Sequence, residues 1–177
     1  KGFYGGCAEY PSEFNPTLDP SSCDDDDSGT VRYVSLRYGG ILLSANNEIN
    51  GITFGGVGRN TDLEYIEVFQ NKDDCSEYFG GAVYLKHLVC VAASDDNLDW
   101  DEGYRGKIQY ALIVQGDNGG ADKSDKGAEM DSGISPDGAQ PVAIPTVYNV
   151  TMVGLGGDVS QSYTDKAKNT AQHFRDN

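Results

Sequence analysis

A repeat of 22 residues is the feature of this sequence that most restricts its fold. Residues 63–68 are followed at this spacing by residues 85–90 (85 − 63 = 22), and residues 73–78 are followed by residues 95–100 (95 − 73 = 22). Two different local patterns that recur at one shared spacing are typical of successive coils of a solenoid. We therefore expect residues 22 apart to lie one above the other in neighbouring coils.

The strand pattern apolar-x-aromatic-apolar-x-apolar extends this repeat in both directions. It begins at Val31, Leu63 and Ile108, with looser copies at Leu85 and Val147. Coils of this length predict an all-β fold, a three-sided, right-handed parallel β-helix with two long loop insertions. Because side chains alternate along a strand, one face of each strand should form the core. That face carries Val34, Leu36, Ile66, Val68, Leu88, Cys90, Ala111, Ile113, Val150 and Met152.

The chain divides into segments of one domain, residues 1–177. Residues 1–29 lack a period and predict an irregular N-terminal loop, and residues 30–114 supply the core coils. Residues 115–145 are polar and glycine-containing and predict a loop insertion, whereas residues 146–177 predict a further coil. Neither end has an amphipathic capping helix, so we expect the chain to be part of a longer protein with open coil ends.

Charge and hydropathy restrict the partners. The chain carries 28 acidic and 13 basic residues, for a formal net charge of −15. Such a surface repels phosphate backbones and attracts cations, which argues against nucleic acid as a partner. No apolar run approaches the roughly 18 residues of a membrane-spanning helix.

The four cysteines fit an oxidising compartment. Cys7 and Cys23 bracket a loop rich in Pro and Asp, where a disulfide would restrain a segment without a core. Cys75 and Cys90 could pair within one coil, but Cys90 lies in the inward register and a buried free thiol is the alternative. These features favour an extracellular or cell-surface location.

Acidic residues in the repeated turns form the main candidate site. Stacking of coils about 4.8 Å apart would place Asp73 and Asp74 beneath Asp95 and Asp96, where like charges destabilise each other unless a cation intervenes. Ca²⁺ takes six to eight hard oxygen ligands and suits this arrangement. The alternative is that the carboxylates cap turn amides and point into water. The candidate ligands are Asp73, Asp74, Glu77, Asp95, Asp96 and Asp99.

Aromatic side chains on the outer face form a second candidate site. The repeat predicts one column of Tyr33, Tyr65, His87 and Tyr110. Flat rings can bind sugar rings or a partner protein, but stacking between neighbours would also explain them.

Evidence for catalysis is thin. A glycosidase needs two carboxylates in different environments, and none stands out here. A polysaccharide lyase needs a base beside a cation, for which Arg105, Lys107 and Asp99 are the candidates. Asn149 begins the sequon Asn-Val-Thr, and the strand register turns it outward, so it is a candidate for N-glycosylation.

Several segments resemble a known family: VRYVSLRYGG at 31–40, NEINGITFGGVG at 47–58, the acidic run with EYFGG at 71–81, and DD through WDEGYRG at 95–106. Together they resemble secreted or lipid-anchored, bacterial-type surface proteins that are similar in fold to the pectin-lyase-like right-handed β-helix group. The resemblance covers the chain from about Thr30 to Asn177. It implies an interior segment of a longer protein and no established activity.

The expected function follows from the repeat, the acidity and the lack of a catalytic constellation. We expect a non-catalytic extracellular or surface β-helix with a structural, adhesive or assembly role and bound Ca²⁺. Its partners would be other surface proteins, further copies through the open coil ends, or a glycan. The alternative is a carbohydrate-active enzyme, a polysaccharide lyase or glycoside hydrolase.

Overall fold

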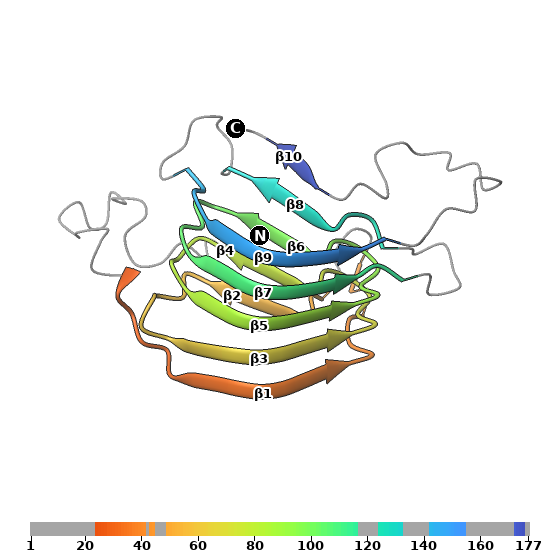
Figure 1. Ribbon diagram of the computed structural model, residues 1–177, viewed down its shortest axis with the longest axis horizontal. Helices are drawn as coiled ribbons and strands as arrows, with labels where there is room; N and C mark the ends of the chain where they lie inside the picture. The colour runs from red at the N-terminus through yellow and green to blue at the C-terminus, as the bar shows by residue number, and fades with distance from the viewer. Residues whose placement is uncertain are drawn as a thin grey trace.

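The fold is a parallel β-helix, in which long and short strands alternate along the chain (Figure 1). The computed structural model describes residues 24–41, 43–44, 49–116, 124–132, 142–154 and 172–175. The long strands are β1 (Thr30–Arg37), β3 (Asp62–Phe69), β5 (Tyr84–Val91), β7 (Lys107–Val114) and β9 (Thr146–Val153). The short strands are β2 (Ile52–Gly55), β4 (Ser76–Phe79), β6 (Leu98–Asp101), β8 (Ala128–Asp131) and β10 (His173–Arg175).

Each kind of strand forms its own five-stranded parallel sheet. The long strands lie in the order β1-β3-β5-β7-β9 and the short strands in the order β10-β8-β6-β4-β2. The chain thus advances by one long and one short strand per coil. The predicted 22-residue register is confirmed, because Ile66 pairs with Leu88 and Val68 pairs with Cys90.

A left-handed residue bends each long strand at its middle. Tyr65 has a φ of 57°, and the equivalent residues Tyr33, His87, Tyr110 and Asn149 have φ between 56° and 58°. Positive φ is uncommon for residues other than glycine and turns the backbone sharply. The two halves of the long strand and the short strand therefore give each coil its three sides.

This bend also changes which side chains face inward. Leu63 and Ile66 are both buried although they are three residues apart, and Tyr65 between them is exposed. Uniform alternation would have turned Leu63 outward, so the predicted core face was incomplete. The first residue of the repeated pattern belongs to the core as well, as Leu85 and Ile108 also show.

Buried aromatic and aliphatic side chains from both sheets fill the interior. Phe54 stacks on Tyr78 at 5.0 Å between ring centroids, and Tyr78 stacks on Tyr104 at 4.7 Å. A disulfide between Cys75 and Cys90 joins the chain just before β4 to strand β5 of the next coil. Both cysteines are fully buried, and because they are bonded to each other Cys90 is not a free thiol.

The segment 115–145, which the sequence predicts as a loop insertion, is not loop throughout. Strand β8 lies within it and pairs in parallel with β6, where Leu98 is opposite Ala128 and Trp100 is opposite Met130. The segment therefore contributes a full rung to the short-strand sheet. This rung extends the acidic turns by one further coil.

Candidate cation site at the acidic turns

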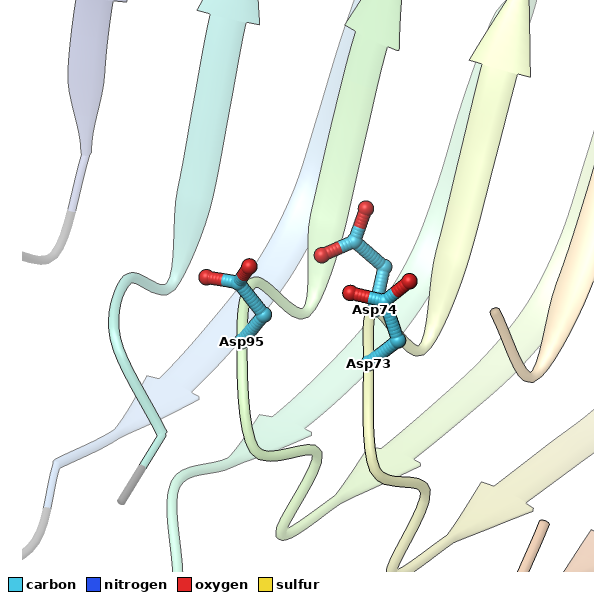
Figure 2. Close-up of side chains that lie close together, drawn as sticks. All are labelled: Asp73, Asp74 and Asp95. Carbon is cyan, nitrogen blue, oxygen red and sulfur yellow. The ribbon is translucent and has the colours of Figure 1, made fainter. Parts of the chain in front are cut away.

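The acidic turns lead into the short strands of neighbouring coils. Asp73 and Asp74 precede β4, and Asp95 and Asp96 occupy the equivalent positions before β6. The strand register then places Glu77 opposite Asp99, as the sequence predicts. Figure 2 shows the side chains of Asp73, Asp74 and Asp95 projecting from the two neighbouring turns.

Three groups of carboxylates are close enough to share a metal ion. Within each group the ligand oxygens lie within 4.8 Å of one another. The first group links the two turns, the second lies at the start of β4 and β6, and the third extends to the turn before β8. Their members are Asp73, Asp74 and Asp95; Asp74, Glu77 and Asp99; and Asp95, Asp96 and Asp125.

Asp74 and Asp95 each belong to two of the groups, and of these two residues Asp74 is the buried one. Its side chain is almost fully buried, with only 6% of the residue exposed. One carboxylate oxygen, Oδ1, accepts a hydrogen bond of 2.9 Å from the backbone N–H of Asp96 and so ties the two turns together. Burial raises the pKa of Asp74 well above its usual value, and the neighbouring carboxylates, led by Asp99 and Glu77, raise it further.

Asp99, on the neighbouring strand β6, is likewise a carboxylate that is buried beside other carboxylates. Burial, followed by the charges of Glu77 and Glu129, raises the pKa of Asp99 to about 8. Its Oδ1 atom is buried and accepts no hydrogen bond from the part of the chain that the structure describes. A buried carboxylate oxygen without a donor is costly unless a proton or a cation compensates it.

The third group already contains a cation from the protein. The Nζ atom of Lys126 lies 3.4 Å from Asp96, 3.3 Å from Asp125 and 2.7 Å from Glu129. Burial lowers the pKa of Lys126, but these carboxylates outweigh that effect and raise it overall. The pKa of Asp96 is also raised, because burial and a hydrogen bond with Glu129 outweigh the attraction of Lys126.

Asp125, Lys126 and Glu129 are site residues that the sequence analysis missed. They lie in the segment expected to be a loop, whose extra residues obscure the repeat. A signal was nevertheless present, since the residues from Glu129, EMDSG, resemble those from Asp99, DWDEG. This likeness identifies β8 as a rung equivalent to β6.

The donor set determines which metal would suit these turns. All the ligands are carboxylate oxygens, which are preferred by hard cations such as Ca²⁺ rather than by zinc or copper. The buried Oδ1 of Asp99 and the buried carboxylate of Asp74 fit a cation of this kind. A bound Ca²⁺ would supply positive charge between adjacent coils, with Asp73, Asp74, Glu77, Asp95 and Asp99 as its nearest ligands.

The predicted aromatic column forms, with the rings stacked face to face. Tyr33 and Tyr65 are 4.7 Å apart, Tyr65 and His87 4.4 Å, and His87 and Tyr110 4.8 Å, measured between ring centroids. The faces of Tyr65 and His87 are therefore covered by their neighbours, and their edges point outward. A sugar needs an open ring face to stack on, which in this column only an end ring can offer.

The residues proposed for an enzymatic alternative differ in their surroundings. The guanidinium of Arg105 lies 2.5 Å from a carboxylate oxygen of Asp24 and also donates to the carbonyl of Gly103. Lys107 is exposed at the start of β7, whereas Asp99 belongs to the acidic cluster.

The remaining candidate positions lie elsewhere. Cys7 and Cys23 fall outside the described residues. Asn149 occupies the left-handed position of β9, is exposed together with Thr151, and accepts a hydrogen bond of 3.1 Å from Gln109. Within the described part of the chain no helix is long and apolar enough to cross a membrane.

Parallel coils, an in-register strand pattern and a buried aromatic core define a pectin-lyase-like β-helix. The comparison with known families agrees with this, since residues 21–176 match the pectate-lyase-like beta helix domain. The chain therefore belongs to this family, as the sequence resemblance implies. Neither a curated protein nor a solved structure gave a significant match.

Proposed function

We propose that this chain is a non-catalytic, extracellular β-helix with a structural or adhesive role at a cell surface, and that Ca²⁺ stabilises it at the acidic turns. The observation that carries the proposal is the position of Asp74. This buried carboxylate belongs to two of the three acidic clusters, and both clusters contain residues from adjacent coils. Like charges at this distance oppose stacking of the coils, and a divalent cation between them reverses the sign of that interaction.

The extracellular part of the proposal is supported by the chemistry of the chain. The Cys75–Cys90 disulfide fits an oxidising compartment, where Ca²⁺ is also available. The net charge of −15 favours cations and disfavours polyanions as partners. Other surface proteins or further copies of the chain would dock on the ends of the coil, and the mass of the native protein measured in Ca²⁺ and in EDTA tests that assembly.

Thermal unfolding in Ca²⁺ and in EDTA tests the metal. A ligand at 100 times its dissociation constant stabilises the folded state by about 2.7 kcal/mol, which for a chain of this size raises Tm by about 5–10 °C. We expect such a rise with Ca²⁺ and a smaller one with Mg²⁺, which demands stricter octahedral geometry. A Tm that is the same in Ca²⁺ and EDTA would remove Ca²⁺ from the proposal.

The matched control is Glu64→Gln, which removes one negative charge from the long-strand sheet. Glu64 lies near Arg32 and Lys86 and belongs to none of the three carboxylate groups. This variant should keep the full Ca²⁺ response. The variant to compare it with is Asp74→Asn in the acidic turns. If Glu64→Gln loses as much of the Ca²⁺-induced rise in Tm as Asp74→Asn does, Ca²⁺ acts by general screening of the negative surface.

A carbohydrate-active enzyme is the second candidate function. It is favoured by the column of Glu77, Asp99 and Glu129, which strand pairing places on consecutive rungs. Neighbouring rungs are about 4.8 Å apart, close to the roughly 5–5.5 Å between the two carboxyl groups of retaining glycosidases. Arg105 supports the enzymatic function less than the sequence suggests, because its positive charge is paired with the carboxylate of Asp24.

Activity on a panel of neutral and acidic glycans separates the two functions. The structural proposal predicts no release of products by the wild-type chain. Product release that disappears in Asp99→Asn, while that variant retains its fold by circular dichroism, would establish the enzymatic function instead. Formation of unsaturated products from acidic glycans would further indicate a lyase.

A further inference from the structure

Lys126 stands at a position where the two preceding turns, before β4 and β6, carry an aspartate. The backbone carbonyl of Asp96 accepts a hydrogen bond from Cys75, and the carbonyl of Lys126 accepts the equivalent bond from Asn97. One coil earlier, the carbonyl of Asp74 accepts from Gly51 in the same way. The column therefore reads Asp74, Asp96 and Lys126, with the charge reversed in the third turn.

The side chain of Lys126 is placed as a bound cation would be. Its side chain is 9% exposed, and its ammonium lies within 3.4 Å of carboxylates from Asp96, Asp125 and Glu129. Two of these residues, Asp96 and Asp125, belong to the third carboxylate group. Asp96 is 2% exposed, and its Oδ1 atom has no hydrogen-bond partner among the described residues, so the nearby ammonium offsets part of the cost of burying this carboxylate.

We infer that the ammonium of Lys126 is a built-in cation that occupies the third carboxylate group and confines metal binding to the two groups around Asp74. Replacing Lys126 with a neutral side chain should open a further Ca²⁺ site formed by Asp95, Asp96 and Asp125. The statement that Lys126 confines metal binding to the groups around Asp74 rests on the proposed function, in which the wild-type chain binds Ca²⁺. The new site expected in the variant does not depend on that binding.

Calcium titration of the wild-type chain and of Lys126→Met by calorimetry tests this inference. Methionine keeps the length and the apolar stem of lysine but supplies neither a charge nor an oxygen ligand. We expect one more Ca²⁺ per chain in Lys126→Met than in the wild type. In EDTA this variant should unfold at a lower temperature than the wild type, and Ca²⁺ should restore the loss.

Two further variants control the experiment. Lys126→Arg keeps the positive charge and should bind the same number of Ca²⁺ ions as the wild type. Lys86→Met removes a lysine from the long-strand sheet, where Lys86 lies over the ring of Tyr84, and should also leave the number unchanged. An increase in either control would overturn the inference.

The outcomes separate this inference from the proposed function. A wild type that binds no Ca²⁺, with a Lys126→Met variant that does, removes the proposed function and leaves the new site standing. A wild type that binds Ca²⁺, with a variant that binds no more, overturns the inference alone. A variant that fails to fold even in saturating Ca²⁺ also overturns it, because the metal then does not replace the ammonium.

Discussion

Asp74 combines almost complete burial with a hydrogen bond that holds two turns together. Its Oδ1 atom accepts the N–H of Asp96, and asparagine can make the same bond without the negative charge. We therefore expect Asp74→Asn to be more stable than the wild type in EDTA, by about 1–3 kcal/mol, because it removes a carboxyl group whose ionisation is opposed by burial and by the neighbouring carboxylates. In Ca²⁺ the order should reverse, since a ligand is lost.

Thermal or urea unfolding of the wild type and of Asp74→Asn, in EDTA and in Ca²⁺, measures this reversal in their order of stability. The control is Glu64→Gln, whose order of stability relative to the wild type should be the same in EDTA and in Ca²⁺. If Asp74→Asn is destabilised equally in both conditions, the carboxylate is needed for packing of the turn rather than for a cation.

Asp99 gives the metal-free protein a defined pH dependence. Its pKa is raised to about 8 in the folded state, above the value of about 3.9 in an unfolded chain. The folded state therefore binds more protons between these values, so the contribution of Asp99 is full below about pH 4 and is lost as pH rises through 8. In EDTA we expect Tm to fall between pH 5 and pH 9.

The variant Asp99→Asn should show a smaller fall over the same pH range, because its amide does not ionise. In Ca²⁺ the wild type should show the opposite contribution, since deprotonated carboxylates bind the metal more tightly. A Tm in EDTA that rises from pH 5 to pH 9 would contradict the raised pKa of Asp99.

At the scale of the strand, Tyr65 has two separable roles. It stacks between Tyr33 and His87, and it adopts the left-handed conformation that bends β3. Tyr65→Ala removes both stacked pairs and keeps the unfavourable φ, so it should cost about 1–3 kcal/mol. Tyr65→Gly loses the same pairs but tolerates positive φ, so it should be about 1 kcal/mol more stable than the alanine variant.

Urea unfolding of the two variants measures this difference. Glycine normally destabilises a strand relative to alanine, so the inverted order reports on the bend itself. The control compares Glu67→Ala with Glu67→Gly, because Glu67 lies in β3 but does not have a positive φ. At this position the alanine variant should be the more stable of the two.

The disulfide connects the acidic turn to the core. Cys75 follows Asp74 directly, and its partner Cys90 lies 15 residues further along the chain in β5. A closed loop of this length contributes about 3 kcal/mol through the unfolded chain. We expect the Cys75→Ala/Cys90→Ala variant to lose about this much stability and, because the turn is less restrained, to bind Ca²⁺ more weakly by calorimetry.

The comparison that isolates the turn is the Ca²⁺ affinity of this variant at a temperature where it is fully folded. An affinity equal to that of the wild type would show that the turn is held by Asp74 and its hydrogen bond alone. The loss of global stability would then be the whole effect of the disulfide.

Across the whole molecule, the repeat determined how much could be predicted. The pairs Leu63–Leu85 and Glu77–Asp99 fall in register because nothing interrupts the 22 residues between them. The additional core position at Leu63 was missed because a bend at Tyr65 resets the alternation, and the pattern of apolar residues three apart was its only signal. Lys126 was missed because Asp96 and Lys126 are 30 residues apart (126 − 96 = 30), so extra chain hides their equivalence.

The one-coil register has a consequence for how such a molecule can grow. Residues 62–83 contain one long strand, one acidic turn and one short strand, and both of their sheet neighbours accept the same pairing pattern. A tandem duplication of these residues would add a rung without altering the contacts made by either original neighbour. Length in this architecture is therefore free to change by whole coils, through gene duplication or in the laboratory, while every added coil brings its own pair of aspartates.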